Sequence, residues 1–326
     1  MIGARMETNY KALTAGIART SFVRRWRIGP VIAAAALATT TLVHSNHVAA
    51  ADFSCATRGA DAEPEVINTT LAGVPALVRL PPSIRHRPII LWHGLGPPAD
   101  PTALMQALPL DEVEAVKVYL GLPLTGARAP KDGADSLGQR QKRDYATLIF
   151  KPIVMGASED LPAVVSALRE RHCVPKDGAV DLFGFSAGGT AVLAALTEQK
   201  VRISAAITVN APTGLDRAIG ALERATHQSY TWSPEARQLA EQTHFASQAA
   251  RVARYRPALL MLQGADDSVS SPQDAGELVH ALEPSYTGKE QRVKVVVLPG
   301  VTHQWAQGAG LEEVRVNVAE WLNRNG

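Results

Sequence analysis

One short stretch of the chain holds a serine in the setting that nucleophilic chemistry requires. Ser186 lies within Gly184-Phe185-Ser186-Ala187-Gly188, after an apolar run and before an Ala- and Leu-rich segment. A Gly-x-Ser-x-Gly sequence between a strand and a helix folds into a tight turn, because small flanking residues avoid clashes. The turn exposes the serine oxygen at a helix N-terminus, which favours developing negative charge. We therefore predict that Ser186 is a nucleophile that attacks an acyl carbonyl.

A serine at neutral pH is a weak nucleophile and needs a base to take its proton. Of the nine histidines, His303 lies in a loop after the last apolar run and before the last helical segment. A histidine there can reach back over the edge of a sheet toward Ser186. We predict that His303 is the base.

The base in turn needs a carboxylate that fixes its tautomer and stabilises the imidazolium. Two candidates follow the apolar run at 258–262, in the segment Gly264-Ala265-Asp266-Asp267. We assign the role to Asp267 and keep Asp266 as the competitor. The resulting chain order is serine, aspartate, histidine, which differs from the order in chymotrypsin-like and subtilisin-like proteases.

The negative oxygen of a tetrahedral intermediate needs two N–H donors. The backbone of Ala187, next to the nucleophile, supplies one. The other is expected from the loop His93-Gly94-Leu95-Gly96, which follows an early apolar run, and Leu95 is the predicted donor. We expect His93 to support this loop by hydrogen bonding, without acting as a base.

The elements that must position these residues can be read from hydrophobic runs. Six runs rich in Val, Ile and Leu lie at 88–92, 116–120, 180–183, 203–209, 258–262 and 293–298. Helical patterns lie between them, near 158–168, 190–199, 272–282 and 311–322. Short apolar strands that alternate with helices indicate the α/β class, with a mostly parallel, doubly wound sheet.

Two stretches break this alternation. Residues 121–150 are polar and rich in Gly and Pro, so we expect a long excursion without an element. Residues 212–255 contain two or three helical patterns and no strand, which predicts a helical cap insertion over the carboxyl edge of the sheet. Four apolar cap residues either line an acyl pocket or pack the cap onto the body: Ile219, Leu222, Leu239 and Phe245.

The first 51 residues differ from the rest and are predicted to be a signal peptide. Basic residues at 24–27 precede an apolar run at 31–43, and small residues follow, so cleavage is expected near Ala49–Asp52. The run is too short to span a bilayer comfortably, so no stable membrane span is expected in the mature protein. An uncleaved anchor is the alternative, and the Arg24-Arg25 pair leaves the export route open. We expect a secreted or periplasmic protein with one domain at 52–326.

Charge, cysteine count and motifs limit the remaining possibilities. The first 51 residues hold six of the 33 Lys and Arg residues and one of the 31 Asp and Glu residues, which leaves 27 basic and 30 acidic residues. A mildly acidic body gives no reason to expect nucleic-acid binding. The two cysteines, Cys55 and Cys173, either form a disulfide or remain two thiols. No metal or phosphate-loop motif occurs, so we expect cofactor-free chemistry.

Four segments together resemble the α/β-hydrolase superfamily: 93–96, 184–188, 264–267 and 300–303. The resemblance covers about residues 70–325 and implies an acyl-enzyme on Ser186 that water hydrolyses. The segment 184–189 is similar to that of prolyl-oligopeptidase-type and dienelactone-hydrolase-like proteins. The segment Trp92-His93-Gly94-Leu95-Gly96 is similar to the palmitoyl-thioesterase group. These two likenesses differ, so neither defines the substrate.

Three functions remain to be distinguished. The first is an exported hydrolase that cleaves a carboxylic ester or thioester of a small-molecule acyl substrate. The second is a small prolyl-oligopeptidase-like peptidase or amidase of the same fold, because the same three side chains can protonate an amine. The third is a binding protein that keeps the fold without catalysis, and the complete set of Ser186, Asp267 and His303 argues against it.

Overall fold

Eight strands form one sheet in the computed structural model, which describes residues 53–56, 62–131, 134–308 and 310–326. The strands are β1 (Glu65–Leu71), β2 (Val74–Leu80), β3 (Ile89–Trp92), β4 (Lys117–Leu120), β5 (Val180–Phe185), β6 (Ile203–Val209), β7 (Ala258–Gly264) and β8 (Val293–Leu298). Their order is β1-β2-β4-β3-β5-β6-β7-β8. Strand β2 runs antiparallel to both of its neighbours, β1 and β4, and all neighbouring pairs from β4 to β8 are parallel. The predicted α/β-hydrolase fold is confirmed.

The six predicted strands are all present, and the structure adds β1 and β2. In these two strands buried residues alternate with more exposed ones. In β3, β4, β5 and β7, by contrast, every residue is buried. The continuous apolar run of a central strand is therefore absent from β1 and β2, which explains why hydrophobic runs did not identify them.

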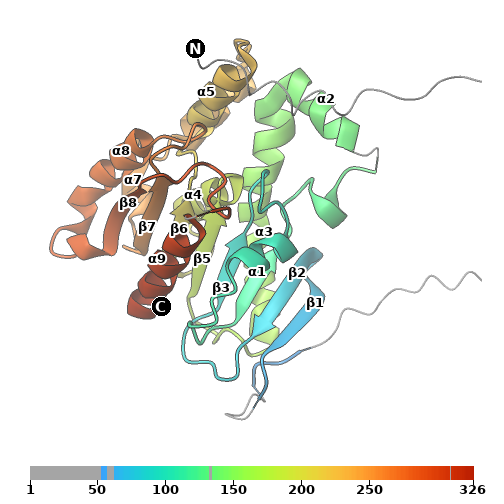
Figure 1. The fold of residues 1–326 in the computed structure, drawn as a ribbon, viewed down its shortest axis with the longest axis vertical. Helices are drawn as coiled ribbons and strands as arrows, with labels where there is room; N and C mark the ends of the chain where they lie inside the picture. Colours follow the sequence, from blue (N-terminus) through green and yellow to red (C-terminus); the bar gives the residue numbers. More distant parts are fainter. Residues whose placement is uncertain (1–52, 57–61, 132–133, 309) are drawn as a thin grey trace, which may run out of the picture. The chain divides into compact units, whose positions relative to one another are not determined.

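Helices cover both faces of the sheet (Figure 1). One face packs against α1 (Pro101–Ala107) and α9 (Gly310–Asn325), through side chains such as Leu104, Val314 and Val318. The other packs against α3 (Gly156–Glu170), α4 (Ala187–Glu198) and α8 (Pro272–Leu282). The described residues also form three short 3-10 helices: η1 (Gly126–Arg128), η3 (Glu283–Tyr286) and η4 (Glu290–Arg292). The doubly wound arrangement buries two cores, one on each face.

The predicted cap insertion between β6 and β7 is present. It contains α5 (Leu215–Thr226), α6 (Pro234–Thr243) and the short α7 (Ala249–Val252). The third helix is shorter than the predicted pattern at 246–255, because residues 246–248 and 253–255 form turns on either side of it.

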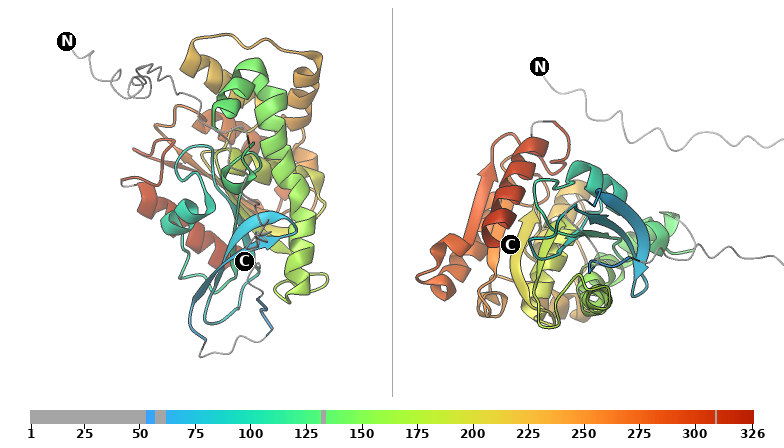
Figure 2. Two further views of the ribbon diagram at one scale, coloured as in Figure 1. Left: turned by 90° about the vertical axis from the view of Figure 1, so that its right-hand side faces the viewer. Right: turned by 90° about the horizontal axis from the view of Figure 1, so that it is seen from below.

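The expectation of an excursion without an element at 121–150 was wrong. Helix α2 (Ala134–Tyr145) is followed by the π-helix η2 (Ala146–Met155), which continues directly into α3. Figure 2 shows η2 and α3 as one long green helical run along one side of the sheet. The polar sequence of α2 and the proline inside η2, Pro152, both disfavour a helix assignment from sequence. The apolar face of η2 is nevertheless buried, which stabilises it through tertiary packing.

Side chains join η2 and α2 to the 212–255 insertion. The hydroxyl of Tyr230 donates to the Asp144 carboxylate, and Lys151 Nζ lies 2.8 Å from Glu235 Oε1. Helices α5 and α6 both contact η2. We use "the cap" for residues 134–155 and 212–255 together, because they form one packed layer.

Two further sequence predictions concern the ends of the domain. Cys55 and Cys173 form a disulfide across 118 residues of sequence, as predicted for the oxidised alternative. No helix in the described ranges is both long and apolar enough to cross a membrane. The predicted signal segment, residues 1–51, lies outside the described residues.

Candidate active site

Ser186 occupies a sharp turn between β5 and α4, as the sequence motif predicts. Its φ of 52° and ψ of −120° are unusual for a residue with a side chain. The neighbouring glycines permit the turn: a Cβ on Gly184 would lie 2.2 Å from the carbonyl oxygen of Gly188. A Cβ on Gly188 would lie 2.5 Å from the carbonyl oxygen of His93. Larger residues are therefore excluded at both positions, and the backbone presents the Ser186 hydroxyl at the start of α4.

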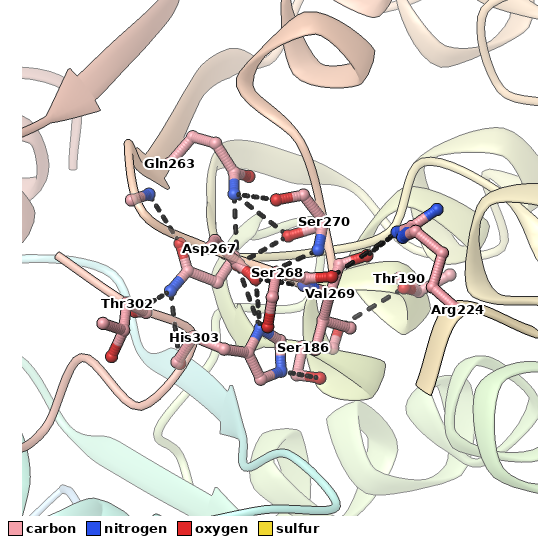
Figure 3. Close-up of polar contacts among 12 residues, drawn as sticks. Ser186, Thr190, Arg224, Gln263, Asp267, Ser268, Val269, Ser270, Thr302 and His303 are labelled. Carbon is pink, nitrogen blue, oxygen red and sulfur yellow. Dashed lines mark hydrogen bonds and ion pairs between the residues drawn. The ribbon is translucent and has the colours of Figure 1, made fainter. Parts of the chain in front are cut away.

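The structure brings Ser186, His303 and Asp267 into one chain of hydrogen bonds (Figure 3). Ser186 Oγ lies 3.0 Å from His303 Nε2, and His303 Nδ1 lies 2.9 Å from Asp267 Oδ2. The three side chains come from the ends of different strands, so the parallel sheet positions all of them at its carboxyl edge. The competitor Asp266 is exposed, and its backbone N–H donates to the carbonyl of Val301.

The Asp267 carboxylate is held by several donors besides His303. Its Oδ1 accepts from the N–H groups of Val269 and Ser270, at 2.7 and 3.1 Å. Its Oδ2 accepts from the Ser270 hydroxyl and from Gln263 Nε2, at 2.9 and 3.2 Å. Burial acts to raise the pKa of Asp267, but the hydrogen bond and charge of His303 and the two backbone donors hold this pKa below its ordinary value. An ionised Asp267 keeps the proton of His303 on Nδ1, which leaves Nε2 free to accept one from Ser186.

Asn210, which follows β6 directly, ties the loops of Asp267 and His303 together. Its Nδ2 donates to the carbonyls of Thr302 and His303, at 2.8 and 3.2 Å. Its Oδ1 accepts from the N–H of Gly264 at 2.8 Å. The side chain is buried, and its φ of 49° lies in the left-handed region that asparagine tolerates. Asn210 was not among the predicted site residues, although a polar residue at the carboxyl end of a buried strand is a usable signal.

The loop after β3 approaches the nucleophile closely. A Cβ on Gly94 would lie 2.6 Å from the ring of Phe185 and 3.1 Å from Ser186 Cβ. His93 is fully buried: its Nδ1 lies 2.7 Å from the carbonyl of Gly94, and its Nε2 accepts from the N–H of Leu122 at 3.2 Å. This pattern assigns the proton to Nδ1, and burial lowers the pKa of His93, so it is a neutral support for the loop, as predicted.

A cavity of about 60 Å³ opens beside Ser186. Leu95 and Ala187, the two predicted N–H donors, both line it. Its other lining residues are Tyr145, Ile149, Phe150, Ile153, Val154, Thr190, Pro212, Ala218 and Val269. Five of the twelve lining residues come from η2 and the end of α2, where no element was expected, and this is the largest contribution of any one segment.

The cap residues considered for an acyl pocket lie elsewhere. Ile219, Leu239 and Phe245 are buried in the core on the α3 and α4 face, and none of them lines the cavity. Leu222 does not line it either. The alternative expectation, that such residues pack the cap onto the body, is correct for the three core residues. Within the described ranges, no group of three or more His, Cys, Asp or Glu residues is arranged to hold a metal.

Comparison with known proteins identifies related sequences and folds. The family model described as the prolyl oligopeptidase family matches residues 155–325, just over half of the 326 residues. A search of curated proteins finds no match.

Solved structures share the fold at low sequence identity. TT1662 from Thermus thermophilus has a TM-score of 0.61 and 19% identity, over 80% of this chain and 99% of its own. The Pyrococcus furiosus esterase Pf2001 has a TM-score of 0.56 and 17% identity, over 80% and 91%. A Mycobacterium tuberculosis puromycin-hydrolyzing peptidase has a TM-score of 0.56 and 17% identity, over 80% of this chain and 39% of its own.

Proposed function

The chain belongs to the prolyl oligopeptidase family, and from this premise we propose that it is an exported serine hydrolase that cleaves carboxylic esters of short, apolar acids. The observation that carries the proposal is the hydrogen-bonded series Ser186, His303 and Asp267 next to a small apolar cavity. The series supports nucleophilic acyl transfer, and the cavity supports an acyl substrate of limited size.

In this mechanism Ser186 Oγ attacks the ester carbonyl carbon while His303 Nε2 takes its proton. The carbonyl oxygen becomes an oxyanion that accepts hydrogen bonds from the N–H groups of Ala187 and Leu95. The C–O bond to the alcohol then breaks, and His303 gives its proton to the departing alkoxide. Water attacks the acyl-enzyme by the same route in reverse, with His303 as base, and releases the acid and free Ser186.

The size of the cavity supports a short acyl group. A cavity of roughly 150 Å³ admits benzene, whereas this one measures about 60 Å³. It therefore fits an acyl chain of roughly two to four carbon atoms. Its lining residues, all in the described part of the chain, include no charged side chain. An apolar acyl group can therefore enter without removing water from a charged group.

A peptidase or amidase is the second candidate. Family membership favours it, and His303 can protonate an amine as readily as an alkoxide. Rates on matched substrates separate the two functions. The values of kcat/KM are measured for p-nitrophenyl acetate, butyrate and octanoate and for alanyl- and prolyl-p-nitroanilides. We expect esters to be hydrolysed with acetate or butyrate preferred, and Ser186→Ala to abolish this activity. Hydrolysis of the anilides alone would overturn the proposal.

Phe150 tests whether the cavity sets the acyl length. Its side chain is buried in the cavity wall, so Phe150→Ala opens space beyond the present end. We expect the octanoate-to-acetate ratio of kcat/KM to rise about tenfold, the effect of roughly two newly buried methylene groups. Leu239→Ala is the matched control, because it truncates a buried cap residue that does not line the cavity. If the octanoate-to-acetate ratio rose equally in Phe150→Ala and Leu239→Ala, the cause would be a general loosening of the cap, and the cavity would not set the acyl length.

Export is part of the proposal. The Cys55–Cys173 disulfide is compatible with an oxidising compartment, and the basic and apolar sequence of residues 1–51 with a signal peptide. Expression of the full chain, cell fractionation and N-terminal sequencing test it. We expect mature protein outside the cytoplasm that begins near Ala49–Asp52. An intact N-terminus on cytoplasmic protein with full activity would contradict export.

A further inference from the structure

The edge of the sheet opposite Ser186 carries an unusual group of arginines. Strands β6, β7 and β8 are neighbours and parallel, and each is preceded by an arginine: Arg202, Arg256 and Arg292. Because the amino ends of parallel strands meet at one edge, the three side chains are brought together there. They line a hollow of about 530 Å³, whose other lining residues are Ala179, Ile203, Ser204, Tyr255 and Pro257.

Backbone carbonyls anchor two of these guanidinium groups. Arg202 Nη1 donates to the carbonyl of Asp177 at 2.8 Å. Arg292 Nε and Nη2 donate to the carbonyls of Arg256 and Ser204, at 3.3 and 3.4 Å. The guanidinium of Arg256 has no hydrogen-bond partner within the described residues. Most of the N–H donors therefore remain available to a ligand in the hollow.

Within the described residues, no carboxylate forms a direct ion pair with this group, and the charge of Asp181 acts on Arg292 only at longer range. Among the described residues, none of the three arginines lies within ion-pair distance of a carboxylate. Arg217, by comparison, pairs with three carboxylates. The contrast is informative because acidic residues outnumber basic ones after residue 51. The buried carboxylate of Asp181, on the adjacent β5, is already paired with Arg87 at 3.5 Å.

The backbone of Arg256, one of the three arginines, has an unusual conformation. Arg256 has a φ of 48°, in the left-handed region that costs energy for a residue with a side chain. Such conformations often persist where the surrounding structure holds a residue for binding. Beside it, Tyr255 is 67% exposed, and the guanidinium of Arg254 lies 5.6 Å from its ring centroid. The rim of the hollow therefore adds an aromatic ring and a fourth positive charge.

We infer that Arg202, Arg256 and Arg292 form a binding site for a phosphate group that carries an organic substituent. A phosphate offers three oxygens and up to two charges to several guanidinium groups at once, whereas one carboxylate is satisfied by a single bidentate arginine. The volume lies within the range of roughly 300–1,000 Å³ for small-ligand sites, and exceeds the need of a bare phosphate ion. The group comes from a phospholipid headgroup or from a soluble phosphate ester.

Binding is tested on the full-length mature protein with three variants. The first is the triple variant Arg202→Gln, Arg256→Gln, Arg292→Gln. The second is Arg256→Gln alone, whose side chain makes no hydrogen bond that folding depends on, so it remains informative if the triple variant does not fold. The third is a matched control with the same loss of charge at surface positions elsewhere: Arg143→Gln, Arg237→Gln, Arg324→Gln.

Two probes distinguish the sources of the phosphate. Sodium pyrophosphate is titrated by calorimetry at constant ionic strength, and flotation is measured with vesicles of phosphatidylcholine alone or with phosphatidylglycerol. We expect saturable pyrophosphate binding that weakens about tenfold in Arg256→Gln and is lost in the triple variant, with the control unchanged. Flotation only with phosphatidylglycerol, lost in the triple variant, identifies a lipid headgroup, and pyrophosphate binding without flotation identifies a soluble ester. No saturable binding of either probe, or equal loss in the control variant, would overturn the inference.

Discussion

Asn210 is expected to position His303, and its removal should reduce catalysis more than a loss of stability explains. The side chain joins the end of β6 to the Thr302 and His303 carbonyls and to the N–H of Gly264. These contacts link the loop of the base to the loop of the acid. In Asn210→Ala both loops lose their common anchor.

The structural cost can be worked from the partners that are left behind. The buried N–H of Gly264 loses its acceptor, at about 1–3 kcal/mol, and the two part-buried carbonyls lose a donor, at about 0.5–1 kcal/mol each. Alanine in the left-handed conformation of residue 210 adds about 1 kcal/mol. The free energy of unfolding should fall by about 3–6 kcal/mol. A shift of His303 by about 1 Å should lower kcat roughly 100-fold, with little change in KM.

Initial rates with p-nitrophenyl acetate and urea denaturation measure the two effects separately. Asn210→Asp keeps an oxygen that accepts from the N–H of Gly264, and aspartate also tolerates a positive φ. Its second oxygen replaces the amide nitrogen and faces the carbonyls of Thr302 and His303, to which it cannot donate. We therefore expect kcat to fall, with a smaller loss of stability than in Asn210→Ala. Tyr286→Phe is the control: it removes one buried hydrogen bond, from the Tyr286 hydroxyl to the Pro257 carbonyl, far from Ser186. If Asn210→Ala lost the expected stability while kcat stayed within about twofold of wild type, the positioning role would be refuted.

Three other predictions concern the fold around the site. Burial raises the pKa of Asp181 from 3.8 to about 6, so the stability this group contributes is complete below pH 3.8 and is lost as the pH rises through 6. Urea titrations of Asp181→Asn should show its stability relative to wild type rising by about 2 kcal/mol between about pH 4.5 and 7.5, and a constant difference would contradict this. Replacing Cys55 and Cys173 by serine should lower the free energy of unfolding by about 2–5 kcal/mol, and unchanged denaturation with and without reductant would count against the disulfide. Gly188→Ala should abolish activity or folding, because its Cβ would lie 2.6 Å from the carbonyl oxygen of Trp92, and full activity would show that the turn relaxes easily.

The sequence predicts the central strands of this fold well, because a strand that is buried on both faces of the sheet is a continuous apolar run in the sequence. Strands such as β6 are continuous apolar runs, and their order of alternation with helices defines the class. Strands β1 and β2 bury one face only and lack such runs. Helices α2 and η2 depend on packing against the rest of the cap, while their own sequences contain polar residues and Pro152, which disfavour helix.

The sequence predicts a residue of the candidate site where a side chain capable of the chemistry closely follows the end of a predicted strand. Ser186, Asp267 and His303 each follow a strand closely, and the topology then brings them together. Asn210 follows a strand in the same way, but its role depends on contacts with loops more than 50 residues away. The cavity beside Ser186 was not predictable, because five of its twelve lining residues come from the helical segment that the local sequence does not favour.

The central claim is that Ser186 is the nucleophile activated by His303, and covalent labelling tests it most directly. The purified protein is treated with a fluorophosphonate probe and digested, and the modified residue is identified by mass spectrometry, with Ser186→Ala and His303→Ala treated in parallel. We predict one modified residue, Ser186, no labelling of Ser186→Ala, and labelling of His303→Ala that is slower by orders of magnitude. Equal labelling of wild type and Ser186→Ala, or modification of another serine, would contradict the account.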